Sequence, residues 1–290
     1  MDSPDPAIEI AKKHFPTIMN QFGILVARDA EGTPMGSGTV TLVDMDGHKL
    51  LLTADHVADE LAASPGEMSV FVYPPGDAPI AYSNTALDLP SFRIHSQDRI
   101  SLPNGKSLDV AAFWAPSDLA AVPHLRWIEA SAQIQAVDYL RREYRNDEMP
   151  FSLLITGFPN FSRATIPSSR SHLFSNFQCW GLLREFIDTP LILASDGARA
   201  PQFIFEIEMP TEATLPVDAP PLVRAFILAL DAEASNEREP IGGYSGAPVF
   251  YLSDAAHHLI GITKEGRKDL GGVMFGTTIS DIILEIGKLG

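Results

Sequence analysis

Three residues of this chain, a histidine, an aspartate and a serine, are of the types that covalent hydrolysis of a carbonyl compound uses. They are His56, Asp109 and Ser245. An imidazole titrates near neutrality and acts as a general base when it lies within hydrogen-bond reach of a nucleophile. A carboxylate can orient that imidazole and stabilise its charged form, while a serine hydroxyl supplies the nucleophile.

The serine lies in the most specific of the three segments, Gly-Gly-Tyr-Ser-Gly-Ala-Pro-Val-Phe at 242–250. A nucleophilic serine needs a tight turn that exposes its hydroxyl and directs neighbouring amides to the place where an oxyanion forms. Glycines on both sides permit such a backbone, because they reach dihedral angles that other residues avoid. The alternative interpretation is an ordinary glycine-rich loop between two strands.

The histidine and the aspartate each adjoin an apolar run. His56 ends the segment Leu-Leu-Thr-Ala-Asp-His at 51–56, and Asp109 begins the apolar strand that we predict at 110–114. An unpaired buried carboxylate is costly, so Asp109 calls for a partner such as a histidine N–H. Taken alone, His56 is also compatible with a histidine that ends a strand without a further role. Asp109, taken alone, is also compatible with an aspartate in a turn or cap at the start of a strand.

Short apolar runs broken by glycine, proline and aspartate predict the strands that must position these residues. We expect strands at 23–28, 37–43, 50–53, 69–73, 110–114, 151–156, 203–208, 248–252, 258–263 and 272–277, with a hairpin turn at 44–47. Strands at this spacing are typical of a sandwich or barrel. Helical spacing predicts helices at 6–19, 130–144, 221–232 and 279–288.

Composition narrows the function classes. The chain has 37 acidic and 21 basic residues and a formal net charge of −16, without the basic stripe that nucleic-acid binding needs. The acidic start lacks the pattern of a signal peptide, and no apolar run suffices for a membrane span, so we expect a cytoplasmic protein that binds neither nucleic acid nor membrane. One cysteine excludes an intrachain disulfide.

The sequence offers no familiar metal or cofactor motif. It contains no His-Glu-x-x-His segment and no cysteine cluster, and we expect His257 and His258 to lie in a loop before a strand. No cofactor or metal is therefore predicted. An α/β-hydrolase, whose nucleophile segment is similar, requires the order serine, acid, histidine, which the few residues between Ser245 and these histidines cannot accommodate.

Taken together, these segments resemble the trypsin-like serine peptidases of the chymotrypsin fold (PA clan), and among them the bacterial members without disulfides. The resemblance extends over roughly 22–285 and is loose over 116–150 and 185–240. It rests on Gly-Ser-Gly at 36–38, Thr-Ala-Asp-His-Val at 53–57, Leu-Asp-Val-Ala at 108–111, Gly-Phe-Pro at 157–159, Gly-Tyr-Ser-Gly-Ala-Pro-Val at 243–249, Gly-Ile-Thr at 261–263 and Gly-Gly at 271–272.

The resemblance implies an all-β fold of two perpendicular antiparallel six-stranded β-barrels, with short N- and C-terminal helices. We expect an N-terminal helical extension at 1–20 and a first barrel at 21–120 that carries His56 and Asp109. Residues 121–290 would hold a connector, the second barrel with Ser245 and the C-terminal helix. An insertion is expected around 210–240, where proline, alanine and glutamate are frequent.

The resemblance also implies the role of each residue. Ser245 would be the nucleophile, His56 the general base and then the general acid, and Asp109 the group that orients His56. The backbone N–H groups of Gly243 and Ser245 would form the oxyanion hole. Tyr244 stands where the family has Asp or Asn before the serine, which argues against activation by a newly cut N-terminus.

Two further sequence features bear on activity and specificity. Asp55, beside the histidine, has a carboxylate that could compete for His56. Glu239 lies about six positions before the serine, where the family has the floor of its primary pocket, and an acid there favours Arg or Lys substrates. The alternative is an exposed loop glutamate. Lys264, Glu265 and Gly266 are the other candidate substrate-binding residues.

Two function classes follow from this comparison. The first is a serine endopeptidase that forms an acyl-enzyme on protein or peptide substrates, either constitutively or only after a regulatory partner or effector binds. Such a partner would dock on the 1–20 helix or on the insertion at 210–240. The second is a catalytically inactive, protease-like module that binds or regulates.

Overall fold

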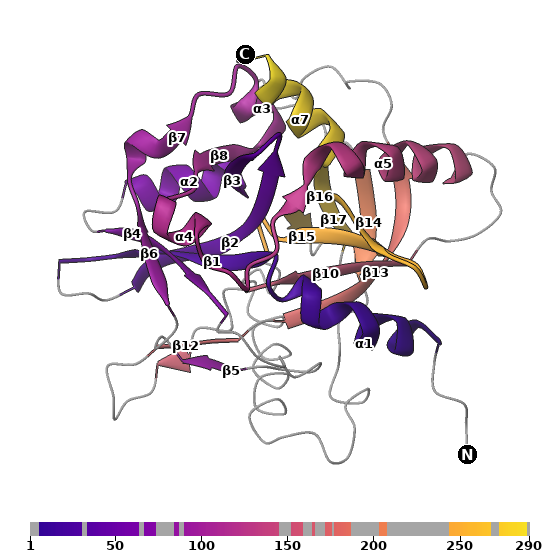
Figure 1. Ribbon diagram of the computed structural model, residues 1–290, viewed down its shortest axis with the longest axis horizontal. Coiled ribbons are helices and arrows are strands. Elements are labelled where there is room, and N and C mark those ends of the chain that lie inside the picture. The colour runs from indigo at the N-terminus through magenta and orange to yellow at the C-terminus, as the bar shows by residue number, and fades with distance from the viewer. Residues whose placement is uncertain are drawn as a thin grey trace.

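A computed structural model of the chain describes residues 6–30, 34–63, 67–73, 84–86, 90–144, 152–158, 164–165, 172–175, 177–186, 203–207, 244–267 and 273–288. Within these residues the regular structure is mostly β (Figure 1). Every strand that the sequence predicts is present, whereas the helix predicted at 221–232 and the insertion around 210–240 lie outside the described residues.

The first sheet has eight strands from the N-terminal half of the chain. Seven form the path β6-β4-β1-β2-β3-β8-β7 through antiparallel pairs, and the eighth, β9, pairs in parallel with β2. Their bounds are β1 (Phe22–Arg28), β2 (Pro34–Met45), β3 (His48–Thr53), β4 (Met68–Val72), β6 (Ser91–Ile94), β7 (Arg99–Ile100), β8 (Ala111–Trp114) and β9 (Ile128–Glu129).

This sheet differs from the six-stranded barrel that the resemblance implies. The two ends of its path, β6 and β7, are separated only by residue 95 and the 3-10 turn at Ser96–Asp98. In that turn the backbone N–H of His95 donates to the Asp98 carboxylate at 2.9 Å, which ends β6. A capped turn therefore divides one strand into two short ones, and the sheet curls back on itself.

The hairpin of β2 and β3 forms where its turn was predicted. Asp46 and Gly47 both have positive φ, 52° and 88°, as a two-residue turn of the primed type requires. The Asp44 side chain accepts a hydrogen bond from the N–H of Gly47 at 2.8 Å. This tight turn sets the register that brings Leu52, next to the end of β3, opposite Thr41 of β2.

The second sheet is a closed barrel of six strands in the order β10-β13-β14-β17-β16-β15, as the resemblance implies for this part of the chain. A separate three-stranded sheet joins β5 of the N-terminal half to β12 and β11. The bounds are β10 (Ser152–Gly157), β13 (Phe177–Phe186), β14 (Phe203–Ile207), β15 (Pro248–Leu252), β16 (His257–Arg267), β17 (Val273–Thr278), β5 (Asn84–Ala86), β11 (Ala164–Thr165) and β12 (His172–Ser175).

The helices lie around the sheets, and Figure 1 shows α5 running beside α7 across the barrel strands. Those with predicted counterparts are α1 (Pro6–Ile18), α5 (Ala130–Tyr144) and α7 (Ile279–Gly287). The short helices α2 (Asp55–Ala62), α3 (Gly105–Leu108) and α4 (Ser117–Ala120) have none. No helix in the described part of the chain combines the length and apolar character needed to cross a bilayer.

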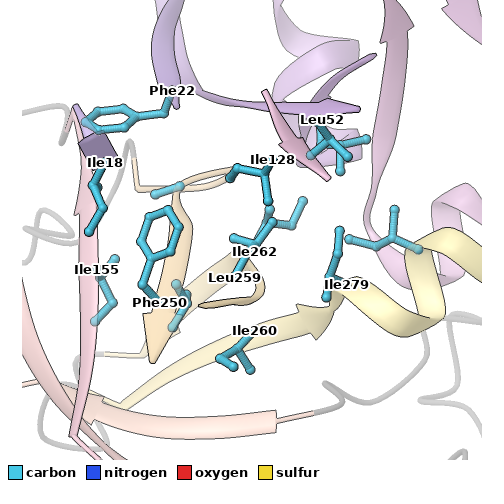
Figure 2. Packing of buried hydrophobic residues seen from close by; sticks show 14 of the residues in the cluster. Ile18, Phe22, Leu52, Ile128, Ile155, Phe250, Leu259, Ile260, Ile262 and Ile279 are labelled. Atoms are coloured by element: carbon cyan, nitrogen blue, oxygen red, sulfur yellow. The ribbon is translucent and has the colours of Figure 1, made fainter. Parts of the chain in front are cut away.

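One hydrophobic cluster joins the two large sheets, and Figure 2 shows part of it. Leu52 and Phe22 enter it from the first sheet, whereas Ile155, Phe250 and Ile262 enter it from the barrel. All five side chains are almost completely buried. Because the same apolar core holds both sheets, side chains at the edge where the sheets meet keep a defined relative position.

A second cluster holds α2 on the first sheet. Val57, Ala58 and Leu61 form the buried face of this helix and pack with Leu51 of β3 and Val70 of β4. Their spacing of one, three and four residues places them on one side of the helix. The opposite side, which carries His56, faces outward.

Candidate active site

The structure brings the three predicted residues together in one hydrogen-bonded path. His56 Nδ1 lies 2.8 Å from Asp109 Oδ2 and 3.0 Å from Oδ1, and His56 Nε2 lies 3.1 Å from Ser245 Oγ. His56 and Asp109 come from the first sheet's helices, whereas Ser245 lies in the turn before β15 of the barrel. The site is therefore assembled between the two sheets.

His56 is held by its helix as well as by its ring. It is the second residue of α2, where backbone N–H groups have no partner within the helix. The His56 N–H donates instead to Asp109 Oδ1 at 3.0 Å, so one carboxylate binds both the backbone and the ring of the same residue. With the apolar face of α2 buried, this double contact fixes the imidazole, whose side chain is about half exposed.

Asp109 does not begin a strand as predicted but ends α3, two residues before β8. Its φ of 52° is left-handed, a conformation that Asp tolerates better than most residues. Burial raises the pKa of Asp109, but the hydrogen bonds and charge of His56, together with the charge of Lys264, outweigh this and hold the pKa below its ordinary value. The carboxylate is therefore ionised at neutral pH and charge-complementary to an imidazolium.

The serine turn is shaped by one glycine. Gly246 has φ 84°, and a Cβ at this position would lie 2.3 Å from the carbonyl oxygen of Thr39. Its N–H donates to Thr263 O at 2.9 Å, and the N–H of Ala247 donates to Tyr244 O at 2.7 Å. These inward amides tighten the turn around Ser245 and leave its hydroxyl at the surface of the barrel facing His56.

The hydroxyl of Ser245 has two acceptors within reach. Besides His56 Nε2 at 3.1 Å, the backbone carbonyl of Lys264 in β16 lies 2.9 Å from Ser245 Oγ. A serine hydroxyl carries one proton and donates it to one acceptor at a time. Lys264 is itself buried, at 8% exposure for the whole residue, and its charge acts on Asp109.

The N–H of Ser245 is one of the two predicted oxyanion donors. Within the part of the chain that the structure describes, it donates to no protein atom. The second predicted oxyanion donor, Gly243, lies outside the described residues, as does Glu239. Glu265 and Gly266 lie in β16, with backbones opposite Phe275 and Met274 of β17.

The expectation that Asp55 competes for His56 is wrong, because the Asp55 carboxylate binds the guanidinium of Arg99 instead. Arg99 of β7 donates through one guanidinium nitrogen to Asp55 and through another, at 2.6 Å, to Asp59. Both aspartates belong to α2, so Arg99 attaches this helix to the sheet beside His56.

Threonines of the first sheet support the serine turn, and of the three only Thr53 lies in one of the sequence motifs named above. Thr41 Oγ1 donates to Gly246 O at 3.0 Å, and the N–H of Thr39 donates to Ser245 O at 3.3 Å. Thr53 Oγ1 donates to the carbonyl of Thr39 at 2.8 Å. Threonine is a common strand residue, so only the pairing of the sheets reveals this role.

The loop that presents Asp109 is tied to the C-terminal half of the chain. Asn104, which precedes α3, donates through Nδ2 to buried Glu285 of α7 at 2.9 Å and through its backbone N–H at 3.2 Å. Thr277 Oγ1 of β17 donates to Leu108 O at 2.7 Å. Helix α3 is thus held at both ends, which positions the carboxylate that follows it.

The described residues around the candidate active site do not form a cluster of metal-binding side chains. Among the described residues, no group of three or more His, Cys, Asp or Glu side chains is placed to hold an ion. The path of Asp109, His56 and Ser245 can instead move a proton, because each step lies within hydrogen-bond distance.

Comparison with solved structures identifies the fold. The active form of the Rv3671c protease from M. tuberculosis matches with a TM-score of 0.50 at 14% identity, over 100% of this chain and 88% of that one. The chain has the chymotrypsin-like fold of the trypsin-like serine peptidases. The inactive form of the same protease matches with a TM-score of 0.49 at 15% identity, over 100% and 98% of the two chains.

A serine endoprotease from Yersinia pestis gives a TM-score of 0.48 at 11% identity, with 99% of this chain and 68% of that chain covered. No protein-family model matches the sequence. No curated protein matches it either.

Proposed function

We propose that this protein is a serine endopeptidase that cleaves peptide bonds through an acyl-enzyme on Ser245. The observation that carries the proposal is the continuous path from the Asp109 carboxylate through both ring nitrogens of His56 to Ser245 Oγ. A serine, a base within reach of it and a third group that orients the base together define an activated nucleophile. The fold supports the same class.

The contacts define the resting proton arrangement. An ionised Asp109 accepts only, so His56 carries its proton on Nδ1 and presents the lone pair of Nε2 to Ser245. When a substrate carbonyl approaches, His56 takes the hydroxyl proton as Ser245 Oγ attacks the carbonyl carbon. The negative charge on Asp109, held by its depressed pKa, then stabilises the imidazolium.

The tetrahedral intermediate needs donors for its oxyanion. The N–H of Ser245 supplies one, and we assign the second to Gly243 by resemblance. His56 next protonates the leaving amine, and the intermediate collapses to an acyl-Ser245. Water, activated by His56, then hydrolyses the ester and restores the hydroxyl.

The proposed substrates are proteins or peptides with a basic residue at the cleavage site. Glu239 would supply an acidic pocket, and the net charge of −16 would attract cationic chains at long range. The segment of Lys264, Glu265 and Gly266 would run beside the bound peptide, because the carbonyl of Lys264 already adjoins Ser245 Oγ. A peptide library with Arg, Lys, Leu and Glu at the cleavage site tests this preference.

The division of the chain into two parts belongs to the same proposal. Residues 21–120 would carry His56 and Asp109, and residues 121–290, with the connector, the second barrel and the C-terminal helix, would carry Ser245.

One observation favours a latent form of the enzyme. The Ser245 hydroxyl can donate its proton to the carbonyl of Lys264, 2.9 Å away, instead of to His56 Nε2 at 3.1 Å. A hydroxyl that donates to a carbonyl is not activated, and a substrate, regulatory partner or effector would have to redirect its proton to His56.

Fluorophosphonate labelling of the purified full chain tests the proposal. We expect a single adduct on Ser245 by intact mass and peptide mapping, and none on Ser245→Ala. Ser91→Ala, which removes the hydroxyl of an exposed serine in β6, serves as a control and retains the adduct. A folded protein that gives no adduct, even with cationic peptides or cell extract present, would refute the peptidase and favour the inactive binding module.

A further inference from the structure

A pair of histidines outside the candidate active site faces each other across two elements. His14 lies in α1, and His257 is the first residue of β16, so the expectation that it lies in a loop is wrong. Their Nδ1 atoms are 3.4 Å apart. His14 is buried and His257 partly so, beside the exposed turn at 254–255. The mechanism proposed above uses neither residue.

The other nitrogen of each ring contacts an oxygen. His14 Nε2 lies 2.8 Å from the carbonyl of Ser253, and His257 Nε2 lies 3.1 Å from Oε1 of buried Gln21. A carbonyl oxygen only accepts, so each Nε2 carries a proton and each neutral ring has its lone pair on Nδ1. Two lone pairs then face each other. Histidines that bind metals have this arrangement, with the distal N–H donating to a carbonyl oxygen.

The spacing of the two nitrogens also suits a shared ion. Zinc–imidazole bonds of about 2.0–2.1 Å at a tetrahedral angle place the two nitrogens about 3.4 Å apart. For a direct hydrogen bond between nitrogens, which is commonly about 3 Å long, 3.4 Å is long. The ring centroids are 5.3 Å apart with 60° between the planes, so the rings meet through their edges and do not stack.

We propose that His14 and His257 bind a divalent transition-metal ion through their Nδ1 atoms. Imidazole nitrogens suit Zn²⁺, Ni²⁺ and Cu²⁺, whereas Ca²⁺ and Mg²⁺ require oxygen ligands. Water completes the coordination shell, because the pair adjoins an exposed turn. The ion fastens α1 to the hairpin of β15 and β16, where Lys13 Nζ already donates to the carbonyl of Asp254.

A metal-free explanation makes the opposite prediction. If the Gln21 side-chain amide is turned over, its NH₂ group donates to His257 Nε2, His257 Nδ1–H donates to His14, and His14 Nε2–H donates to Ser253. Every group is then satisfied without an ion. In this arrangement neither Nδ1 atom is set up to bind a metal ion. Any weak metal binding that did occur would then not depend on Gln21.

Titration of the untagged full chain with Zn²⁺ at pH 7.5, followed by calorimetry, distinguishes the two. We expect one site per chain and, with Co²⁺, the visible absorption of a nitrogen-ligated ion. His257→Gln and His14→Gln should each abolish the site. Gln21→Met, which removes the acceptor for the distal N–H but no ligand, should weaken binding about 10- to 100-fold.

Matched histidine controls are His258→Gln, adjacent in β16, and His48→Gln, exposed beside Trp114; both should bind as the wild type does. Circular dichroism in EDTA checks that each variant folds. If His14→Gln does not fold, His257→Gln and Gln21→Met decide the question. Absence of a 1:1 site in wild type, equal binding by His257→Gln, or unchanged affinity in Gln21→Met would overturn the proposal.

Discussion

Replacing Asp109 by Asn tests whether this carboxylate sets the proton arrangement of His56. The wild-type carboxylate accepts from His56 twice, at Nδ1 and at the backbone N–H. The asparagine oxygen can retain the backbone contact, and its NH₂ group then faces Nδ1. The ring would have to accept there and carry its proton on Nε2, where it could no longer take the proton of Ser245.

The expected loss of reaction rate at Ser245 is large, because the proposed nucleophile loses its base while the fold is kept. An Asn at the carboxylate position of such a triad lowers kcat by about 10⁴. This corresponds to about 5 kcal/mol of transition-state stabilisation, at about 1.36 kcal/mol for each factor of ten. Stability should change far less, since the residue stays polar, similar in size and hydrogen-bonded to α2.

The assay is the second-order rate of fluorophosphonate labelling at Ser245, which requires no known substrate. Asp55→Asn is the matched control: it also removes an acid next to His56, but one that binds Arg99. We expect a change of less than about fivefold there, since no proton-transfer contact is lost. Equal losses in both variants, or less than about tenfold in Asp109→Asn, would refute the assigned role of Asp109.

Three further outcomes are expected. Gly246→Ala should lower the free energy of unfolding, measured in urea, by about 2–4 kcal/mol, because φ is 84° and the new Cβ would meet a backbone oxygen at 2.3 Å. Gly47→Ala, with φ 88° and nothing within 4 Å of the new Cβ, should lower it by only about 1 kcal/mol. Glu285→Gln should lower the free energy of unfolding by about 1–2 kcal/mol, since it weakens the contact with Asn104. It should also slow labelling of Ser245 severalfold, because Asn104 precedes the helix α3 that positions Asp109. The lowered pKa of Asp109 contributes stability above its unfolded value of about 3.9. The stability difference from Asp109→Asn should therefore shrink below about pH 4 in unfolding curves, as the pH passes through the folded pKa.

Local patterns predicted most of the strands but not how the first sheet ends. The turn at 44–47 was recognisable because Asp-Gly suits a primed hairpin, whereas the turn at Ser96–Asp98 has no such signal. The strand at Phe177–Phe186 was not predicted, since Gly181 and the adjacent polar pair Arg184 and Glu185 interrupt its apolar pattern. Helix α2 was likewise missed, because it is only eight residues long and its buried face depends on the sheet beneath it.

The sequence alone determined the candidates for the site: a serine, a histidine and an aspartate of suitable type, and the glycine beside Ser245. Those are local properties, legible from residue type and immediate neighbours. Only the tertiary structure decided that Asp55 faces Arg99, that Asp109 binds both the ring and backbone of His56, and that His14 meets His257. Each of these contacts joins residues more than 40 positions apart, and its geometry depends on how the sheets and helices pack.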